Sequence, residues 1–308
     1  MKNSKPQTPN FREAPNPKLQ IKAPAQRIGI SSLVFLWSLK VGVWSFCGFP
    51  PPALATDALS LSWTNNLLTL SSSTLPGGKL DIWYLEAFCH KGSTHRDWGK
   101  TTLPHKTVLL SSELRHLRFR TTVKPEVEML HDVRAGADGL EFEFQFKNQG
   151  SQPVDLEWFQ PACIRVQRFT GLDQTNYTAR SFIYTASGLT TLDKTRRAEE
   201  ALYRGGQVYV PSGINLDDVN PRPISPEQPV NGLIGCFSAD GKYLMATASD
   251  STHELFEGVF VCLHNDPHVG GLGPGETKRI RARIYLLEND PQELLRRYRK
   301  DFPENPTR

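Results

Sequence analysis

Two polar segments of this 308-residue chain carry side chains that could do chemistry. In the first, His95-Arg96-Asp97-Trp98-Gly99-Lys100, an imidazole, a carboxylate and a tryptophan are close neighbours. A tryptophan offers a flat apolar face to a sugar ring, and carboxylates and guanidinium groups hydrogen-bond to hydroxyls. We therefore predict that His95, Asp97 and Trp98 bind a polar ligand. The alternative is a solvated loop whose tryptophan folds back onto the core.

The second polar segment is His264-Asn265-Asp266-Pro267-His268, with His253, Glu254 and Glu257 shortly before it. Side chains two residues apart point the same way in extended backbone, so His264, Asp266 and His268 could face one metal ion. However, Asn-Asp-Pro favours a turn that would separate them, and the spacing matches no closed zinc template. His264 and Asp266 are also candidates for ligand binding, and the sequence indicates no other cofactor.

A proline-rich stretch, residues 207–231, contains Asp217, Asp218 and Arg222. It is too long for a simple turn, and long structured loops often carry function. We add Arg222 to the candidates for ligand binding. The alternative is a strut that covers one end of the fold.

Four cysteines follow residue 55, namely Cys89, Cys163, Cys236 and Cys262. Four cysteines allow three complete disulfide pairings, and the sequence does not choose among them. Because three of the four lie in apolar runs, buried free thiols are the alternative to disulfides. No pair has the CxxC spacing that suggests zinc or redox chemistry.

Short strands separated by turn residues must position these groups. Residues 140–147 alternate strictly between apolar and polar, the period of a half-buried strand. With the turn at 148–151 and a second alternating run at 154–158, they predict a hairpin. Further strands are expected at 80–85, 113–123, 181–185, 207–211, 232–238, 242–248, 256–264 and 278–287. Many short strands with few helices predict an all-β fold, a large antiparallel, supersandwich-like β-sandwich over residues 79–302.

A short C-terminal helix completes the predicted fold. Asp290 is a suitable N-cap and Pro291 suits the first helical position. Leu294, Tyr298 and Phe302 recur every four residues and form one apolar face. Residues 303–308 are expected to be a tail. A second helix is expected over 194–204.

The N-terminal residues predict export. A basic head, an apolar run over 28–49 and Ala53-Leu54-Ala55 form the pattern of a signal peptide, which we place at 1–55. An uncleaved anchor is the alternative. Residues 56–78 are expected to be a linker and first strand. We expect the protein in the periplasm, in the cell envelope or outside the cell, without a membrane span after cleavage.

The charge balance argues against a nucleic-acid partner. The chain has a formal net charge of +4, but seven basic residues and one acidic residue lie in the leader. The remaining chain is therefore slightly acidic and has no general attraction for nucleic acids or anionic membranes.

Residues 139–166 and 271–287, GLEFEFQFKNQGSQPVDLEWFQPACIRV and GLGPGETKRIRARIYLL, resemble galactose-mutarotase-like sugar-processing β-sandwiches. That family has a catalytic His before Pro where this chain has Gln160-Pro161, and a catalytic Glu where it has Leu263-His264-Asn265. With neither catalytic position matched, the resemblance implies the scaffold alone. Through HRDWGKTTLPHKTVLLS and NGLIGCFSADGKYL, the chain also resembles a group of uncharacterised exported bacterial proteins.

These observations lead to three functional hypotheses. The first is an exported carbohydrate-binding or carbohydrate-associated sandwich, with a glycan or sugar as partner. The second is a sugar-active enzyme of the envelope (an epimerase, lyase or hydrolase) that uses His95, Asp97, His264 and Asp266. The third is a structural or interaction module. The second requires the loop at 90–105 and the segment at 253–268 to meet in one cleft.

Overall fold

The computed structural model of the chain describes residues 59–92, 98–201 and 206–304, which belong to one compact unit. His95 and Asp97 lie outside the described residues. Two strands, β1 and β2, lie within 56–78, which the sequence predicted to be a linker and first strand.

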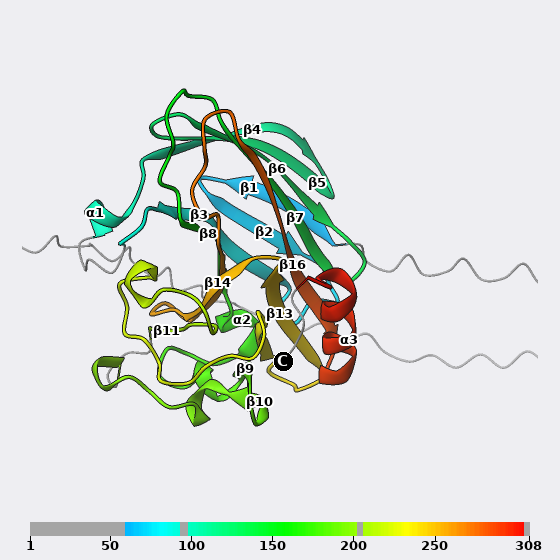
Figure 1. The fold of residues 1–308 in the computed structure, drawn as a ribbon. Helices are drawn as coiled ribbons and strands as arrows, with labels where there is room; N and C mark the ends of the chain where they lie inside the picture. The colour runs from blue at the N-terminus through cyan, green and yellow to red at the C-terminus, as the bar shows by residue number, and fades with distance from the viewer. Residues whose placement is uncertain (1–58, 93–97, 202–205, 305–308) are drawn as a thin grey trace, which may run out of the picture. The chain divides into compact units, whose positions relative to one another are not determined.

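Two large antiparallel sheets make up this unit (Figure 1). The seven-stranded sheet has the order β1 (Ser60–Thr64), β2 (Leu67–Ser71), β3 (Lys79–Cys89), β8 (Trp158–Arg165), β15 (Cys262–Pro267), β14 (Thr252–Glu257), β11 (Gln207–Tyr209). The nine-stranded sheet has the order β10 (Gly188–Thr191), β9 (Ser181–Thr185), β12 (Ile234–Phe237), β13 (Tyr243–Ser249), β16 (Thr277–Glu288), β7 (Gly139–Asn148), β6 (Val127–Ala135), β5 (His116–Val123), β4 (His105–Glu113). The predicted all-β sandwich is confirmed.

Alternation along the strands builds the core between the sheets. In β7, Phe142, Phe144 and Phe146 are buried and the residues between them are more exposed, as the sequence predicted. Phe159, Ile164 and Leu263 of the seven-stranded sheet join the same core. The residues that alternate with these point away from it, so the seven-stranded sheet has a second, outer face.

The predicted hairpin of 140–147 with 154–158 is wrong. β7 pairs with β6 and β16, whereas β8 belongs to the other sheet and pairs with β3 and β15. The chain therefore crosses between the sheets over residues 149–157. Asn148 holds this crossing, because its side-chain amide donates to the carbonyls of Gln152 and Gly273, at 2.7 and 3.0 Å.

The run at 256–264, expected to be one strand, is divided by a turn over residues 258–261. β14 and β15 then pair antiparallel, with Phe256 opposite His264 and Glu254 opposite Asp266. A glycine and a residue in the left-handed region, Val261 (φ 55°), make this turn. It brings two polar strand faces side by side.

The C-terminal helix α3 (Pro291–Asp301) forms as predicted. The Asp290 side chain accepts hydrogen bonds from the backbone N–H groups of Gln292 and Glu293, at 2.9 and 3.1 Å. Leu294, Tyr298 and Phe302 are buried in a cluster with residues of β9, β13 and β16, so the helix covers the outer face of the nine-stranded sheet (Figure 1).

The remaining helical elements are single turns. They are α1 (Trp98–Thr101), α2 (Gln167–Thr170) and the 3₁₀ turns η1 (Tyr177–Ala179), η2 (Leu192–Lys194), η3 (Glu199–Ala201) and η4 (Leu216–Asp218). Over the described residues, no helix has both the length and the apolar character that a membrane crossing requires.

Candidate functional site

The outer face of the seven-stranded sheet gathers the polar side chains that could form a site. On β15, Leu263 points into the core, so Cys262, His264 and Asp266 share the outer face. All three are at most 2% exposed, although they lie on an outward-facing surface. Segments of the chain must therefore cover this face.

Residues 207–231 supply part of that cover. Within this segment the backbone N–H of Asn220 donates to Glu254 Oε2 at 2.9 Å, and Asp218 Oδ1 accepts from the N–H of Gly92 at 2.6 Å. Val219, between them, is fully buried. The proline-rich stretch is thus packed down on the polar strands of the sheet.

A pair of buried carboxylates lies under this cover. Glu254 and Asp266 occupy opposite positions on β14 and β15, and both are fully buried. Gln160 of β8 donates to Asp266 Oδ2 at 2.8 Å. Glu254 Oε1 and Asp266 Oδ1 have no hydrogen-bond partner among the described residues. Buried acceptors of this kind require donors, and a bound ligand or water can provide them.

The electrostatics of the pair favour a neutral Glu254. Burial raises the pKa of Glu254 well above its usual range, because it disfavours the charged carboxylate, and the charge of Asp266 raises it further. The N–H of Asn220 acts in the opposite direction. Glu254 can therefore hold a proton at a pH where an exposed glutamate has lost it.

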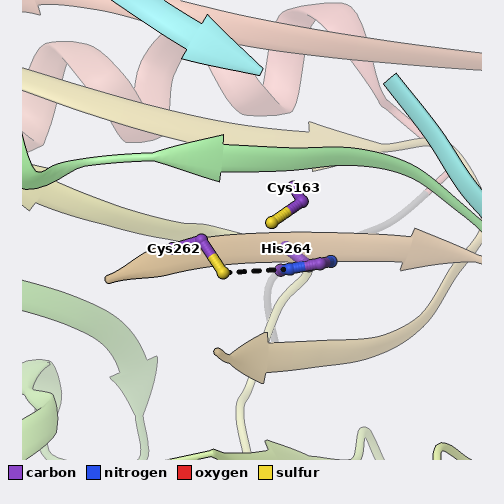
Figure 2. A group of neighbouring side chains, drawn as sticks. All are labelled: Cys163, Cys262 and His264. Carbon is purple, nitrogen blue, oxygen red and sulfur yellow. Dashed lines mark hydrogen bonds between the residues drawn. The ribbon is translucent and has the colours of Figure 1, made fainter. Parts of the chain in front are cut away.

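Cys163, Cys262 and His264 form a second cluster on the same face (Figure 2). Cys163 comes from β8, while Cys262 and His264 come from the neighbouring β15. Figure 2 shows the Cys262 sulfur directed toward the imidazole, and Sγ lies 3.4 Å from His264 Nε2. On its other side, His264 Nδ1 is 3.7 Å from Asp266 Oδ1. The His264 imidazole thus lies between the thiol of Cys262 and the carboxylate pair.

The thiols and the imidazole shift one another's pKa values. A hydrogen bond with Cys163 lowers the pKa of Cys262 well below its usual range; burial opposes this effect and His264 reinforces it. Burial lowers the pKa of His264, but Cys262 and Asp266 outweigh burial and raise it well above normal. The cluster therefore stabilises a thiolate beside an imidazolium.

Three flat rings stack at the far end of this face. Trp158 stacks on His253 with centroids 5.7 Å apart, and His253 stacks on His268 at 5.6 Å. His268 Nε2 also lies 2.9 Å from Glu157 Oε1, and Lys91 Nζ lies 3.8 Å from Glu157 Oε2. The beginning of the 90–105 loop therefore meets the 253–268 segment at Glu157.

The described structure places two of the predicted ligand-binding residues on this outer face. His264 and Asp266 lie together on the outer face, as described above. Trp98 is the first residue of α1, and its side chain, like His95 and Asp97, lies outside what the structure describes. Arg222 is exposed, two residues beyond the Asn220 that binds Glu254.

The metal set predicted from the sequence, His264, Asp266 and His268, is not brought together as a group. His268 lies with Glu157 and His253. In the described part of the chain, the one set of three metal-ligand side chains with donor atoms within 4.8 Å of one another is Cys163, Cys262 and His264. All four described cysteines are buried free thiols.

Sequence reasoning missed Gln160, Cys163, Glu254 and Cys262 as site residues. One signal was available, because the two-residue step from His264 to Asp266 extends backward to Cys262. The positions of Cys163 and Gln160 follow only from the pairing of β8 with β15, which no local pattern specifies.

No family model matches the sequence, and no curated protein is similar to it. Several solved structures are similar in fold. One is a galactose mutarotase-like protein from Lactobacillus casei, with 9% identity and a TM-score of 0.42, covering 74% of this chain and 99% of that one.

Two further structures are similar. An aldose epimerase homologue from C. elegans has 7% identity and a TM-score of 0.39, covering 76% of this chain and 100% of that one. The α-N-acetylgalactosaminidase NagBb from Bifidobacterium bifidum has 9% identity and a TM-score of 0.47, covering 81% and 38%. Galactose-mutarotase-like proteins, the family that the sequence resembles, are thus among the similar solved structures, and at these identities the similarity concerns the fold alone.

Proposed function

We propose that this protein binds a carbohydrate on the outer face of its seven-stranded sheet, around Glu254 and Asp266. One observation carries the proposal. Two buried carboxylates on adjacent strands each leave one oxygen without a hydrogen-bond donor among the described residues. A sugar presents neighbouring hydroxyl groups that can donate to two such acceptors at once.

The surroundings of the two carboxylates favour a neutral polar ligand. Gln160 binds one oxygen of Asp266, and the other, Oδ1, has no hydrogen-bond donor among the described residues and lies 3.7 Å from His264 Nδ1. Because burial and Asp266 raise the pKa of Glu254, the protonated form can also donate a hydrogen bond to a sugar oxygen. A mixed set of donors and acceptors suits hydroxyl groups, which both donate and accept.

Glycan binding tests this proposal. The purified protein is applied to an array of neutral and acidic glycans, and the strongest ligand is then titrated by calorimetry. Asp266→Asn and Glu254→Gln each replace a buried carboxyl group that hydrogen-bonds to the sugar with an amide. We expect each variant to weaken binding by at least about tenfold. Trp98→Ala tests the predicted stacking residue in the same assay.

Asp132→Asn is the matched control. Asp132 is a part-buried carboxylate in the other sheet, where it binds Arg118 and Arg134, and its loss should leave glycan affinity unchanged. A flat response across the array, or full binding by both site variants, would overturn the proposal.

A sugar-active enzyme is the second candidate, favoured by the raised pKa of Glu254 beside Asp266. General acid catalysis needs a group that holds its proton at the working pH, and the raised pKa of Glu254 is a shift in that direction. Anomeric exchange of free sugars and release of reducing ends from polysaccharides are the assays. Glu254→Gln should then abolish turnover while leaving part of the binding. Absence of turnover on all substrates favours a binding protein.

We also propose that the protein is exported, as the leader pattern in residues 1–55 indicates. Expression of the full chain in a bacterial host, followed by fractionation and N-terminal sequencing, tests this. Export with a new N-terminus near residue 56 is expected, and a chain that starts at 56 should stay in the cytoplasm. Retention of the full chain in the cytoplasm would contradict the proposal.

A further inference from the structure

We infer that Cys163, Cys262 and His264 bind a divalent metal ion of the zinc class, with Glu86 facing the fourth coordination position. This site is separate from the proposed carbohydrate function, although Asp266 touches both. Two thiolates and an imidazole are the ligand types that borderline-soft cations such as Zn²⁺ prefer.

The distances suit one ion. The donor atoms of the three residues all lie within 4.8 Å of one another, and Cys262 Sγ is 3.4 Å from His264 Nε2. In a tetrahedral zinc site, with Zn–S of about 2.3 Å and Zn–N of about 2.0 Å, ligand atoms are roughly 3.5–3.8 Å apart. Small side-chain movements are therefore enough to close the three donors around an ion.

The imidazole already has the orientation of a metal ligand. His264 directs Nε2 toward the Cys262 sulfur, while Nδ1 faces Asp266 Oδ1 at 3.7 Å. Gln160 in turn fixes the other oxygen of Asp266. A carboxylate, backbone carbonyl or water behind a ligating histidine sets its tautomer and orientation, and nearly all histidine ligands of metals have such a partner.

The fourth position faces Glu86, whose Oε2 lies 3.9 Å from His264 Nε2. Its side chain is 35% exposed, so this side of the cluster opens toward solvent and gives an ion a path of entry. The two cysteines, by contrast, are buried. Glu86 or a water molecule completes four-coordination.

Gly258 keeps the space beside the sulfur open. A Cβ atom at this position would lie 2.2 Å from Cys262 Sγ and 3.6 Å from His264 Nε2. Gly258 does not have a positive φ, so its backbone does not itself demand glycine. A side chain at position 258 would instead collide with or crowd its neighbours, the two donor atoms of the proposed site.

Cobalt(II) titration tests the inference, because thiolate ligands give Co²⁺ an intense near-ultraviolet charge-transfer band and tetrahedral geometry gives visible bands. The untagged full chain is reduced, stripped of metal and titrated without oxygen. We expect one Co²⁺ per chain with both sets of bands, which Zn²⁺ then abolishes by displacement. Elemental analysis of the protein before stripping gives an independent count.

Variants assign the ligands. Cys262→Ser and Cys163→Ser should remove the charge-transfer intensity in steps, whereas Cys236→Ser, at a buried cysteine on β12, should retain it. Asp266→Asn, which acts through His264, should weaken binding by roughly 10–100-fold. Gly258→Ala keeps every ligand and should weaken binding because its methyl group meets the sulfur.

Three results would overturn the inference. They are the absence of thiolate–cobalt bands in reduced protein, a full spectrum in Cys262→Ser, and a Cys163–Cys262 disulfide mapped by mass spectrometry in protein prepared with reductant and Zn²⁺. Circular dichroism of each variant establishes that it is folded. Glycan binding by metal-free protein separates this inference from the proposed function, since either can fail while the other holds.

Discussion

Arg197 binds the carboxylate of Glu257 with two hydrogen bonds, at 2.9 and 3.1 Å. The Glu257 side chain is completely buried, and Tyr209 Oη donates to it as well, at 3.2 Å. Arg197 lies in the segment where the sequence predicted a helix over 194–204, and Glu257 ends β14. This ion pair therefore ties a connecting segment to the strand that carries Glu254.

Replacing Arg197 by alanine should destabilise the protein by about 3–5 kcal/mol, because it leaves a buried carboxylate without its cation. Urea unfolding followed by fluorescence measures the change. The neighbouring Arg196 provides the matched control, since it pairs with Glu227 at the surface, where such a pair contributes roughly 0–1 kcal/mol. Equal losses in the two alanine variants would contradict this prediction.

His131 should make stability depend on pH. It is buried between the sheets, within hydrogen-bond distance of Tyr84 Oη at 2.7 Å and Thr121 Oγ1 at 3.0 Å, and burial lowers its pKa from 6.5 to about 3. Between these values the unfolded chain binds a proton that the native protein does not. The contribution of His131 is therefore complete above pH 6.5 and is lost as the pH falls toward 3.

The expected slope for this one group is about 1.4 kcal/mol per pH unit. Urea unfolding at a series of pH values from 7 to 4 measures it. His131→Gln removes the titrating group while offering hydrogen bonds to the same partners, so its slope should be smaller. An unchanged slope would mean that His131 does not titrate in this way.

Leu294 should be the most sensitive leucine of α3, since it is fully buried against β13 and β16. Leu294→Ala should cost about 3 kcal/mol in the free energy of unfolding, from lost burial and the cavity left behind. Leu114→Ala makes the same chemical change at a side chain that is 69% exposed, and should cost less than about 0.5 kcal/mol. Thermal unfolding distinguishes the two.

Removing the N-cap of α3 should lower the free energy of unfolding by a smaller amount. Asp290→Ala removes an acceptor for two backbone N–H groups and should cost about 1 kcal/mol. Glu288→Ala, at the exposed end of β16, removes a carboxylate two residues away without touching the cap. If both variants have the same midpoint of unfolding, the cap does not stabilise the helix.

Local patterns predicted the elements whose causes are local. The alternation of β7 and the cap and apolar stripe of α3 follow from neighbouring residues, and both were predicted correctly. The helix expected over 194–204 did not form as such; in its described part, residues 195–198 are not helical and only the 3₁₀ turn η3 follows them. There, tertiary bonds override propensity, because Gln207 accepts from the backbone of Ala198 while Arg197 reaches Glu257.

Pairing between distant strands could not be predicted in the same way. The sequence joined 140–147 to 154–158 because the turn between them resembles a hairpin loop, but the chain instead changes sheets there. Two residues of the candidate site shared this difficulty. His264 and Asp266 were visible as a spaced pair, whereas Cys163 and Gln160 reach them only through the β8–β15 contact.

The place of β15 in the sheet has a consequence for the order in which the fold assembles. β4, β5 and β6 each pair with the next strand along the chain and can assemble early, but the pairing of β15 with β8 must wait until most of the polypeptide exists. Pairings between remote segments form slowly because loop closure precedes any gain in contacts. The outer face that β8 and β15 share should therefore be completed late in folding, after β4 to β7 have paired with one another.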